Sequence, residues 1–338
     1  MQKKLIALAV AGMVAAPVAM AQSNVTIYGI MDAAISSSSS SYAGDSNRTG
    51  LDFSQENQSG SRIGFRGTED LGNGLKASFV IEQGIIADTG ESAQGGRTFG
   101  RQTFVALSGG FGTVSAGRQY SPQFVFVGAV DPFGLGTVGD VSFTGMYKLT
   151  ASGRLDNLLA YTSPDMSGFR VAAGYTGNAV GNETGQDGDL RALAISPTYR
   201  NGPLFVGLNY HRVDIKGFSD DNNVLDIGGT YDFGVVKIAA LYGMDEIDNI
   251  RDSRRWMVGA TVPVSEAGSV MVSYSREKDK ELAGDPEAGK WALGYDHMLS
   301  TRTNMYAVVG YINKNDDDRF AIRNSFERSV QVGLRHRF

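Results

Sequence analysis

The sequence predicts an all-β protein: a 16-stranded antiparallel β-barrel that crosses a membrane, with its third loop folded inward. Three observations support this fold class. Strand-like segments alternate between apolar and polar residues, their connections alternate between short and long, and the chain opens with a secretory leader. The chain also holds 44 glycines in 338 residues, a composition that disfavours helices and suits turns and crowded strands.

Residues 1–21 have the three parts of a secretory signal peptide. Two lysines are followed by a short apolar run, and the segment closes with the cleavage site Ala19-Met20-Ala21. A membrane-spanning helix would need about 20 consecutive apolar residues, and Pro17 interrupts this run. We therefore expect a cleaved leader at 1–21 and one outer-membrane β-barrel domain at 22–338.

The first three strand-like segments, 24–35, 62–68 and 75–83, each show two faces of different chemistry. Every second residue is mostly apolar, and these side chains share one face of the strand. The opposite faces carry Tyr28, Asp32, Arg62, Arg66, Lys76 and Glu82. Because unpaired charges are costly to bury in a dry core, we expect these faces to line a water-filled interior, which a 16-stranded barrel can hold.

Two kinds of connection separate the strand-like segments and alternate along the chain. Seven are tight and rich in Gly, Pro, Asn or Asp, as hairpin turns require, and eight are long and polar. Fifteen connections join sixteen strands and leave both chain ends on the short-turn side, as expected of an outer-membrane barrel. The short connections are 71–74, 109–112, 163–168, 201–203, 232–234, 263–268 and 300–301. The long ones are 36–60, 85–100, 120–153, 178–189, 214–222, 245–250, 278–289 and 313–325.

The final segment, 330–338, predicts the strand that closes the barrel. Val330, Val332 and Leu334 share one face with the terminal Phe338, while polar residues and Gly333 occupy the other. A secreted β-sandwich, such as an adhesin, is the alternative fold. It would explain neither the long connection after every second strand nor this aromatic end.

The connection 120–153 is the longest and the most apolar. Unstructured loops beyond about 12–15 residues are usually functional. Its phenylalanines and valines are too many for a solvated external loop, so we expect it to fold into the barrel mouth. Asp131 and Asp140 would then project into the bore, opposite the arginines of the wall. An external cap with a small core of its own is the alternative.

Several segments resemble a known family. Segment 61–75, which reads SRIGFRGTEDLGNGL, resembles the second-strand signature of the general diffusion porins of Gram-negative bacteria. Segments 24–32, 112–122, 153–157 and 332–338 resemble other parts of the same proteins. The resemblance covers the whole chain after the leader and is strongest to the porins of β-proteobacteria.

This resemblance implies a homotrimer of 16-stranded barrels, each narrowed by an inward third loop that faces a cluster of wall arginines. By position, the basic side of the constriction falls on Arg62, Arg101, Arg154 and Arg118. The last of these matches an arginine near the root of the loop, which serves either the pore or the subunit contact. The acidic side falls on Glu82, Asp131 and Asp140.

Opposed charges across a narrow aqueous neck create a transverse field, and arginine stays charged at working pH. The sequence therefore predicts passive passage of small hydrophilic solutes and inorganic ions. Basic side chains outnumber acids at the neck, which favours a mild anion preference, whereas acidic loops such as 316–318 oppose it at low salt. A substrate-specific channel is the alternative, with Tyr28, Tyr147 and Tyr161 along a binding path.

No catalytic, cofactor or metal site is predicted, so the protein is not expected to be an enzyme. The chain has no cysteine, and His211, His297 and His336 show no spacing typical of a triad or metal site. We expect the first two near strand ends, at the membrane boundary. With 31 Lys and Arg against 36 Asp and Glu, a nucleic-acid partner is not expected. Expected partners are further copies of the chain, outer-membrane lipid and lipopolysaccharide.

Overall fold

The fold was taken from a computed structural model of the chain. It describes residues 24–39, 48–52, 57–141, 153–179, 181, 190–215, 221–281, 287–314 and 327–338. The predicted signal peptide and the acidic tract 316–318 lie outside the described residues.

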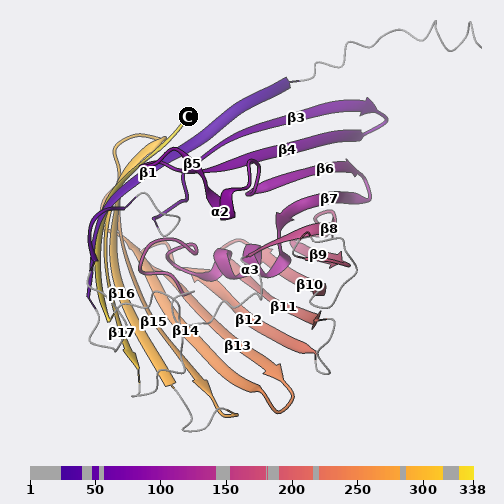
Figure 1. Ribbon diagram of the computed structural model, residues 1–338. Coiled ribbons are helices and arrows are strands. Elements are labelled where there is room, and N and C mark those ends of the chain that lie inside the picture. Colours follow the sequence, from indigo (N-terminus) through magenta and orange to yellow (C-terminus); the bar gives the residue numbers. More distant parts are fainter. Residues whose placement is uncertain are drawn as a thin grey trace, which may run out of the picture.

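The described residues form sixteen long strands, each antiparallel to the next, that close into a barrel (Figure 1). In the first half these are β1 (Asn24–Ser39), β3 (Arg62–Gly72), β4 (Leu75–Ile86), β6 (Gln102–Gly109), β7 (Gly112–Tyr120), β8 (Arg154–Thr162), β9 (Phe169–Thr176) and β10 (Leu190–Asn201). In the second half they are β11 (Leu204–Ile215), β12 (Asn222–Asp232), β13 (Lys237–Ile247), β14 (Arg251–Pro263), β15 (Gly268–Asp279), β16 (Glu287–Met298), β17 (Thr303–Lys314) and β18 (Arg328–Arg337). Shorter elements are β2 (Arg48–Asp52), β5 (Glu91–Ser92), α2 (Ala93–Gly96) and α3 (Pro122–Val130).

The last strand closes the barrel, as predicted. β18 pairs antiparallel with β1, from Ile30 opposite Arg337 to Ser39 opposite Arg328. Beyond the strand, Gly29 and Phe338 exchange two backbone hydrogen bonds of 3.1 Å. Figure 1 shows the C-terminus beside β1. The alternative of a two-sheet sandwich is therefore wrong.

The seven predicted short connections are hairpin turns in the structure. Between β3 and β4, Gly72, Asn73 and Gly74 all adopt positive φ, at 83°, 53° and 77°. Such a conformation is easy for glycine and tolerable for asparagine. The alternation of glycine-rich and polar breaks therefore located the hairpins correctly.

One predicted long loop, 245–250, is wrong in length. β13 and β14 pair up to Ile247 opposite Arg251, which leaves a turn of only 248–250. The polar residue Asp245 lies inside the barrel, 3.0 Å from Arg251, and is almost fully buried. A polar run resembled a loop in the sequence because the inner face of this wall is itself charged.

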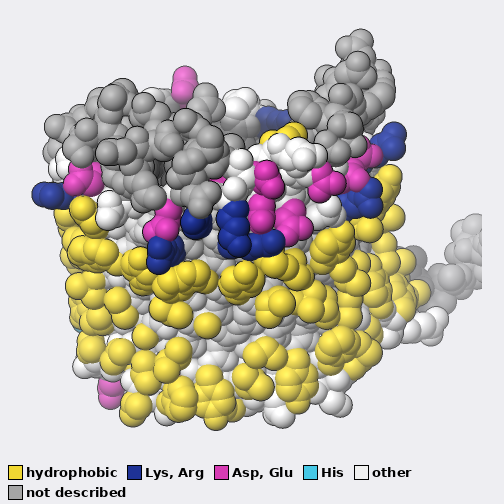
Figure 2. Space-filling model, turned by 90° about the horizontal axis from the view of Figure 1, so that it is seen from below, with side chains coloured by type: hydrophobic (Ala, Val, Ile, Leu, Met, Phe, Trp, Pro, Cys, Tyr) yellow, Lys and Arg dark blue, Asp and Glu magenta, His cyan; other side chains and the backbone are white. Residues whose placement is uncertain are grey.

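The outer face of the barrel is apolar. Val25, Ile27 and Ile35 of β1 are each about 60% exposed, whereas Asp32 of the same strand is buried on the inner face. Figure 2 shows the hydrophobic side chains as a belt, with charged side chains along one edge of it. Among the described residues no helix is long and apolar enough to span a membrane, a finding that concerns helices alone.

The segment 121–141 begins with the helix α3. Ser121 caps it by accepting a hydrogen bond from the Phe124 backbone N–H, and Pro122 occupies the first helical turn, where its missing N–H costs nothing. Figure 1 shows α3 inside the ring of strands. The helix therefore starts where the chain leaves β7 and turns away from the wall.

Apolar side chains hold this segment against the inner wall. Phe126 and Val127 of α3 pack in one cluster with Phe205, Leu241 and Met257 of the wall strands. Burying each such side chain contributes about 1.5–3 kcal/mol. The neighbours of these wall residues along their strands are exposed on the outer face, so the cluster lies on the inner face.

The rest of the segment approaches the wall closely at several glycines, of which Gly294 and Gly310 are examples. A Cβ on Gly294 would lie 2.7 Å from the ring of Phe133, and one on Gly310 would lie 2.9 Å from the backbone oxygen of Val138. Larger side chains at these positions would displace the segment. The wall therefore has space for it only because these residues lack side chains.

Candidate functional site

Three of the predicted arginines meet inside the barrel. Arg101 Nε lies 2.7 Å from Glu82 Oε1, and Arg62 Nη1 lies 3.8 Å from the same oxygen. Arg101 and Arg154 each donate a hydrogen bond to the phenol oxygen of Tyr120, at 2.8 and 3.0 Å. We call Arg62, Arg101, Arg154, Tyr120 and Glu82 the arginine cluster.

Glu82 is the carboxylate of this cluster. It is 3% exposed and also accepts a hydrogen bond of 3.0 Å from the hydroxyl of Tyr28. Glu82 lies on β4, between its two arginines. Arg62 lies on β3, on one side of β4, and Arg101 lies just before β6, on the other side. Glu82 contacts two of the three arginines, and Arg154 is held by Tyr120 instead. With three guanidinium groups and one carboxylate, the cluster carries excess positive charge.

Tyr120 is the member that the sequence did not reveal. Strict alternation from Val114 would place it on the outer face, but the pairing of β7 with β8 shifts register between Gly117 and Gln119. Gly117 permits the shift with a φ of 133°. A bulge next to a glycine turns the end of the strand inward, and this irregularity has no clear signal in the residue pattern.

Aromatic rings orient Arg154. The rings of Tyr120 and Phe124 stack with centroids 4.4 Å apart and planes 4° apart. The guanidinium carbon of Arg154 lies 4.6 Å from the centroid of Tyr120 and 5.9 Å from that of Phe124. Such cation–π attraction contributes about 0.5–2 kcal/mol. The root of α3 therefore positions a wall arginine.

Arg118 is not part of the arginine cluster. It lies opposite Thr103 on the outward face of the wall, and its Nη1 lies 2.6 Å from Asp156. Its Nε donates a hydrogen bond to the backbone oxygen of Gly100. Arg97 also contacts Asp156, at 2.7 Å. The structure therefore separates Arg118 from the other three predicted arginines.

The structure corrects the expectation that Asp131 and Asp140 project into the bore. Both are about 5% exposed. The Asp131 carboxylate accepts hydrogen bonds from the backbone N–H groups of Phe133, Leu135 and Val141, at 3.1, 2.9 and 3.3 Å. Its oxygens are therefore used to fold the loop upon itself, since buried N–H groups need acceptors.

Burial also changes the acidity of this loop carboxyl. It raises the pKa of Asp131 from 3.8 to about 7, and the nearby Asp140 acts in the same direction. The three backbone hydrogen bonds oppose the shift but do not cancel it. Lys290 of the wall donates a hydrogen bond to the backbone oxygen of Asp140. This part of the loop is thus anchored by polar as well as apolar contacts.

Comparison with known proteins identifies the family. Residues 7–318 match the family model described as Gram-negative porin. The chain belongs to the Gram-negative porin family. It is 34% identical over 362 residues to "Outer membrane porin protein 32" of Delftia acidovorans, with 100% of both chains covered. It is 33% identical over 395 residues to an outer membrane porin protein of Bordetella pertussis, again with 100% of both covered.

A solved structure supports the same assignment. The anion-selective porin from Comamonas acidovorans matches 94% of this chain and 100% of its own, with a TM-score of 0.81 and 31% identity. The family resemblance seen in the sequence is thereby confirmed. This porin is an outer-membrane β-barrel of a Gram-negative bacterium, and its relatives are channels rather than enzymes.

A second charged network of this porin lies on the inner wall across from the arginine cluster. Arg255 lies 3.2 Å from Asp226, and Arg251 lies 3.0 Å from both Asp245 and Glu277. The side chains of Arg255, Asp226, Asp245 and Glu277 are at most 1% exposed. Charges buried this deeply must be paired. The sequence did not reveal this network because part of it was assigned to a loop.

This network also contacts the third loop. Gln123 of α3 donates a hydrogen bond of 2.5 Å to Asp226. His211, expected at a strand end near the membrane boundary, is instead buried on the inner wall, 3.2 Å from Asn209. That expectation rested on the neighbouring Tyr210 and was wrong. Tyr210 lies on the outer face, but it does not lie at the end of β11.

Proposed function

We propose that this porin is a general diffusion channel whose neck lies between the arginine cluster and the third loop. Small hydrophilic solutes and inorganic ions would pass through it by diffusion. The single observation that carries the proposal is the convergence of Arg62, Arg101 and Arg154 on Tyr120 and one carboxylate. Guanidinium groups attract and orient polar solutes without holding them, because water competes for the same contacts.

We further propose a mild preference for anions at the neck. The cluster sets three arginines against one carboxylate, the Asp131 carboxyl is turned into the loop, and Asp140 is buried. A basic constriction favours anions. The relative from Comamonas acidovorans is described as anion-selective, which supports the proposal.

The proposal can be tested by measuring reversal potentials across planar bilayers in a KCl gradient. We expect an anion preference, and we expect the triple variant Arg62→Gln, Arg101→Gln, Arg154→Gln to lose it. Arg276→Gln is the matched control, because Arg276 lies on the outer face and pairs with Glu287. At 1 M salt the screening length is about 3 Å, so distant surface charges no longer contribute. Cation selectivity of the unmodified channel under these conditions would contradict the proposal.

The proposed assembly is a homotrimer surrounded by lipid and lipopolysaccharide. Gln83, Thr103 and Arg118 form a polar patch on the outer face of β4, β6 and β7, a position where lipid would be a poor partner. A subunit contact suits these residues better. Chemical cross-linking of the protein in membranes should yield trimers, and exclusive recovery of monomers would refute the assembly.

The substrate-specific alternative receives no support from the residues suggested for it. Tyr161 lies on the outer face and donates a hydrogen bond to Phe111. The hydroxyl of Tyr28 donates a hydrogen bond to Glu82 in the proposed neck. Tyr147 lies outside the described residues.

A further inference from the structure

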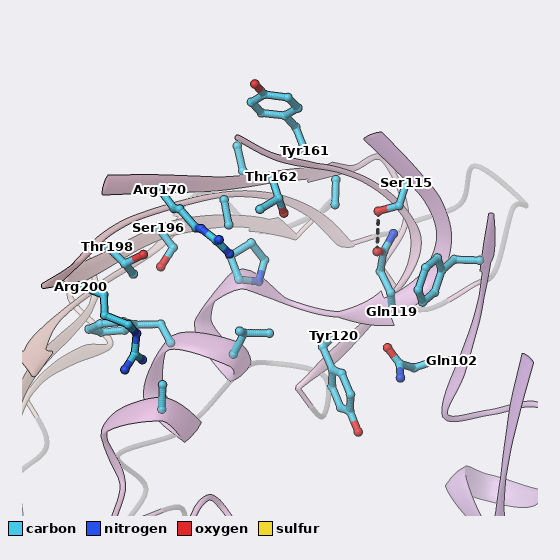
Figure 3. Close-up of a pocket in the computed structure, with 18 of the residues that line it drawn as sticks. Gln102, Ser115, Gln119, Tyr120, Tyr161, Thr162, Arg170, Ser196, Thr198 and Arg200 are labelled. Carbon is cyan, nitrogen blue, oxygen red and sulfur yellow. Dashed lines mark hydrogen bonds between the residues drawn. The ribbon is translucent and has the colours of Figure 1, made fainter. Parts of the chain in front are cut away.

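A cavity of about 450 Å³ lies between α3 and the inner wall formed by β6 to β11 (Figure 3). Tyr120 borders both this cavity and the arginine cluster, but Arg62, Arg101 and Arg154 do not line it. Its basic residues, Arg170 and Arg200, lie at the ends of β9 and β10 next to short turns. The cavity is therefore a compartment of its own on the short-turn side of the loop.

The helix side of this cavity is apolar. Val125 is 60% exposed, which is unusual for a valine inside a water-filled barrel. Phe126 and Ala129 line the same side. Water gains nothing from contact with this surface, so a ligand with an apolar part would be favoured over water here.

The strand side of the cavity is polar and basic. Figure 3 shows Arg170, Ser196, Thr198 and Arg200 on the strands that face α3. Thr198 pairs with Arg170, and Arg200 follows two residues later on the same face. The two guanidinium groups thus come from adjacent strands and can reach one bound group together.

These two arginines are available to a ligand. Arg170 pairs at 3.1 Å with Asp165, but both side chains are about half exposed, so water weakens this pair. The guanidinium of Arg200 lies 4.6 Å above the ring of Phe205, and no ion pair involves it in the described part of the chain. Stacking leaves its N–H groups free to donate to a carboxylate.

We infer that this cavity binds amphipathic organic anions, namely carboxylates that carry a short apolar chain. The carboxylate is held by Arg170 and Arg200, while the chain lies against Val125 and Ala129. The inference rests on the proposed function in one respect, since the solute reaches the cavity through the aqueous bore. It adds a saturable site to a passage that is otherwise a diffusion path.

The test measures block of the KCl current by hexanoate, acetate and hexylammonium, each added to either side of a planar bilayer. We expect hexanoate to block saturably at a concentration about tenfold below acetate, since two buried methylene groups account for that factor. Hexylammonium should not block. Block should be stronger from the short-turn side, where Arg170 and Arg200 lie.

Substitutions separate this site from the neck. Arg170→Gln and Arg200→Gln should each raise the half-blocking concentration of hexanoate about tenfold, as loss of a charge-assisted hydrogen bond implies. Val125→Ser should raise it for hexanoate but not for acetate. Arg66→Gln is the matched control, because Arg66 is exposed and lies over Tyr28, away from the cavity.

Equal block by hexanoate and acetate would overturn the inference, as would block that persists unchanged in both Arg200→Gln and Val125→Ser. Loss of hexanoate block in Arg101→Gln alone would place the site at the neck and overturn it too. Reversal potentials without anion preference would contradict the proposed selectivity instead, so the two failures are distinguishable.

Discussion

At the scale of single residues, the neck depends on how few carboxylates face its arginines. Glu82 accepts contacts from Arg62, Arg101 and Tyr28, and it is the carboxylate through which the cluster is partly neutralised. Sequence alternation placed Glu82 and Arg62 on the inner face correctly. It could not place Asp131, because the orientation of this carboxyl depends on backbone N–H groups that become available only once the loop has folded.

Glu82→Gln should therefore increase the anion preference of the channel. The amide keeps the size of the side chain and removes its charge, so the field of the arginines is less compensated. We expect the anion-to-cation permeability ratio to rise roughly two- to fivefold, as one unit charge near water implies. Reversal potentials measure this ratio. Glu287→Gln is the control, because Glu287 is the first residue of β16 and pairs with Arg276, away from the arginine cluster. An unchanged ratio in Glu82→Gln would show that the charge of Glu82 does not act on the permeating ions, and a lower ratio would contradict the argument directly.

Asp131 should make the third loop sensitive to pH. Its pKa in the folded loop is raised to about 7 from 3.8, so the folded loop binds a proton more tightly than the open loop does. The stabilisation is fully present below about pH 4 and is lost as the pH rises to about 7. Hydrogen exchange of the 133–141 amides, corrected for intrinsic rates, should be slower at pH 5 than at pH 8. Asp131→Asn should abolish this difference, and persistence of the difference would assign it to another group.

At the scale of elements, the strands were predictable and the third loop was predictable only in part. A period of two and glycine-rich turns identify a strand without knowledge of its neighbours, which is why the hairpins were located correctly. The apolar content of 121–141 likewise indicated a buried loop. Which wall residues receive it follows from contacts across the barrel, such as Phe126 with Phe205, and these have no local signal.

Gly310→Leu tests the packing of this loop against the wall. A side chain there would meet the backbone oxygen of Val138 at 2.9 Å, and a backbone atom yields less easily than a side chain. We expect the loop to move further into the bore and the single-channel conductance to fall. Ala307→Leu, exposed on the outer face of the same strand, is the control. An unchanged conductance in Gly310→Leu would mean that the loop does not narrow the bore.

At the scale of the whole molecule, the barrel reverses the usual arrangement of a soluble protein. Apolar side chains face outward, and the interior holds charges that either pair with one another, as Arg255 and Asp226 do, or line the bore. This two-sidedness follows from the period of two along the strands, which the sequence shows except where a bulge interrupts it, as in β7. The arrangement of charges inside was not visible there, because each ion pair, such as Arg255 with Asp226, joins residues on different strands of the wall.

The most direct test of a wet, loop-narrowed interior uses cysteine labelling, which is possible because the chain has no cysteine of its own. Val125 and Val105 are almost equally exposed, at 60% and 59%, but Val125 lies on α3 inside the barrel and Val105 on the outer face of β6. In membranes, we expect Val125→Cys to react with a water-soluble sulfonate thiol reagent, faster than with its trimethylammonium analogue, and to lose conductance. Val105→Cys should not react. An unreactive Val125→Cys, or one whose labelling leaves the conductance unchanged, would contradict an aqueous passage narrowed by the third loop.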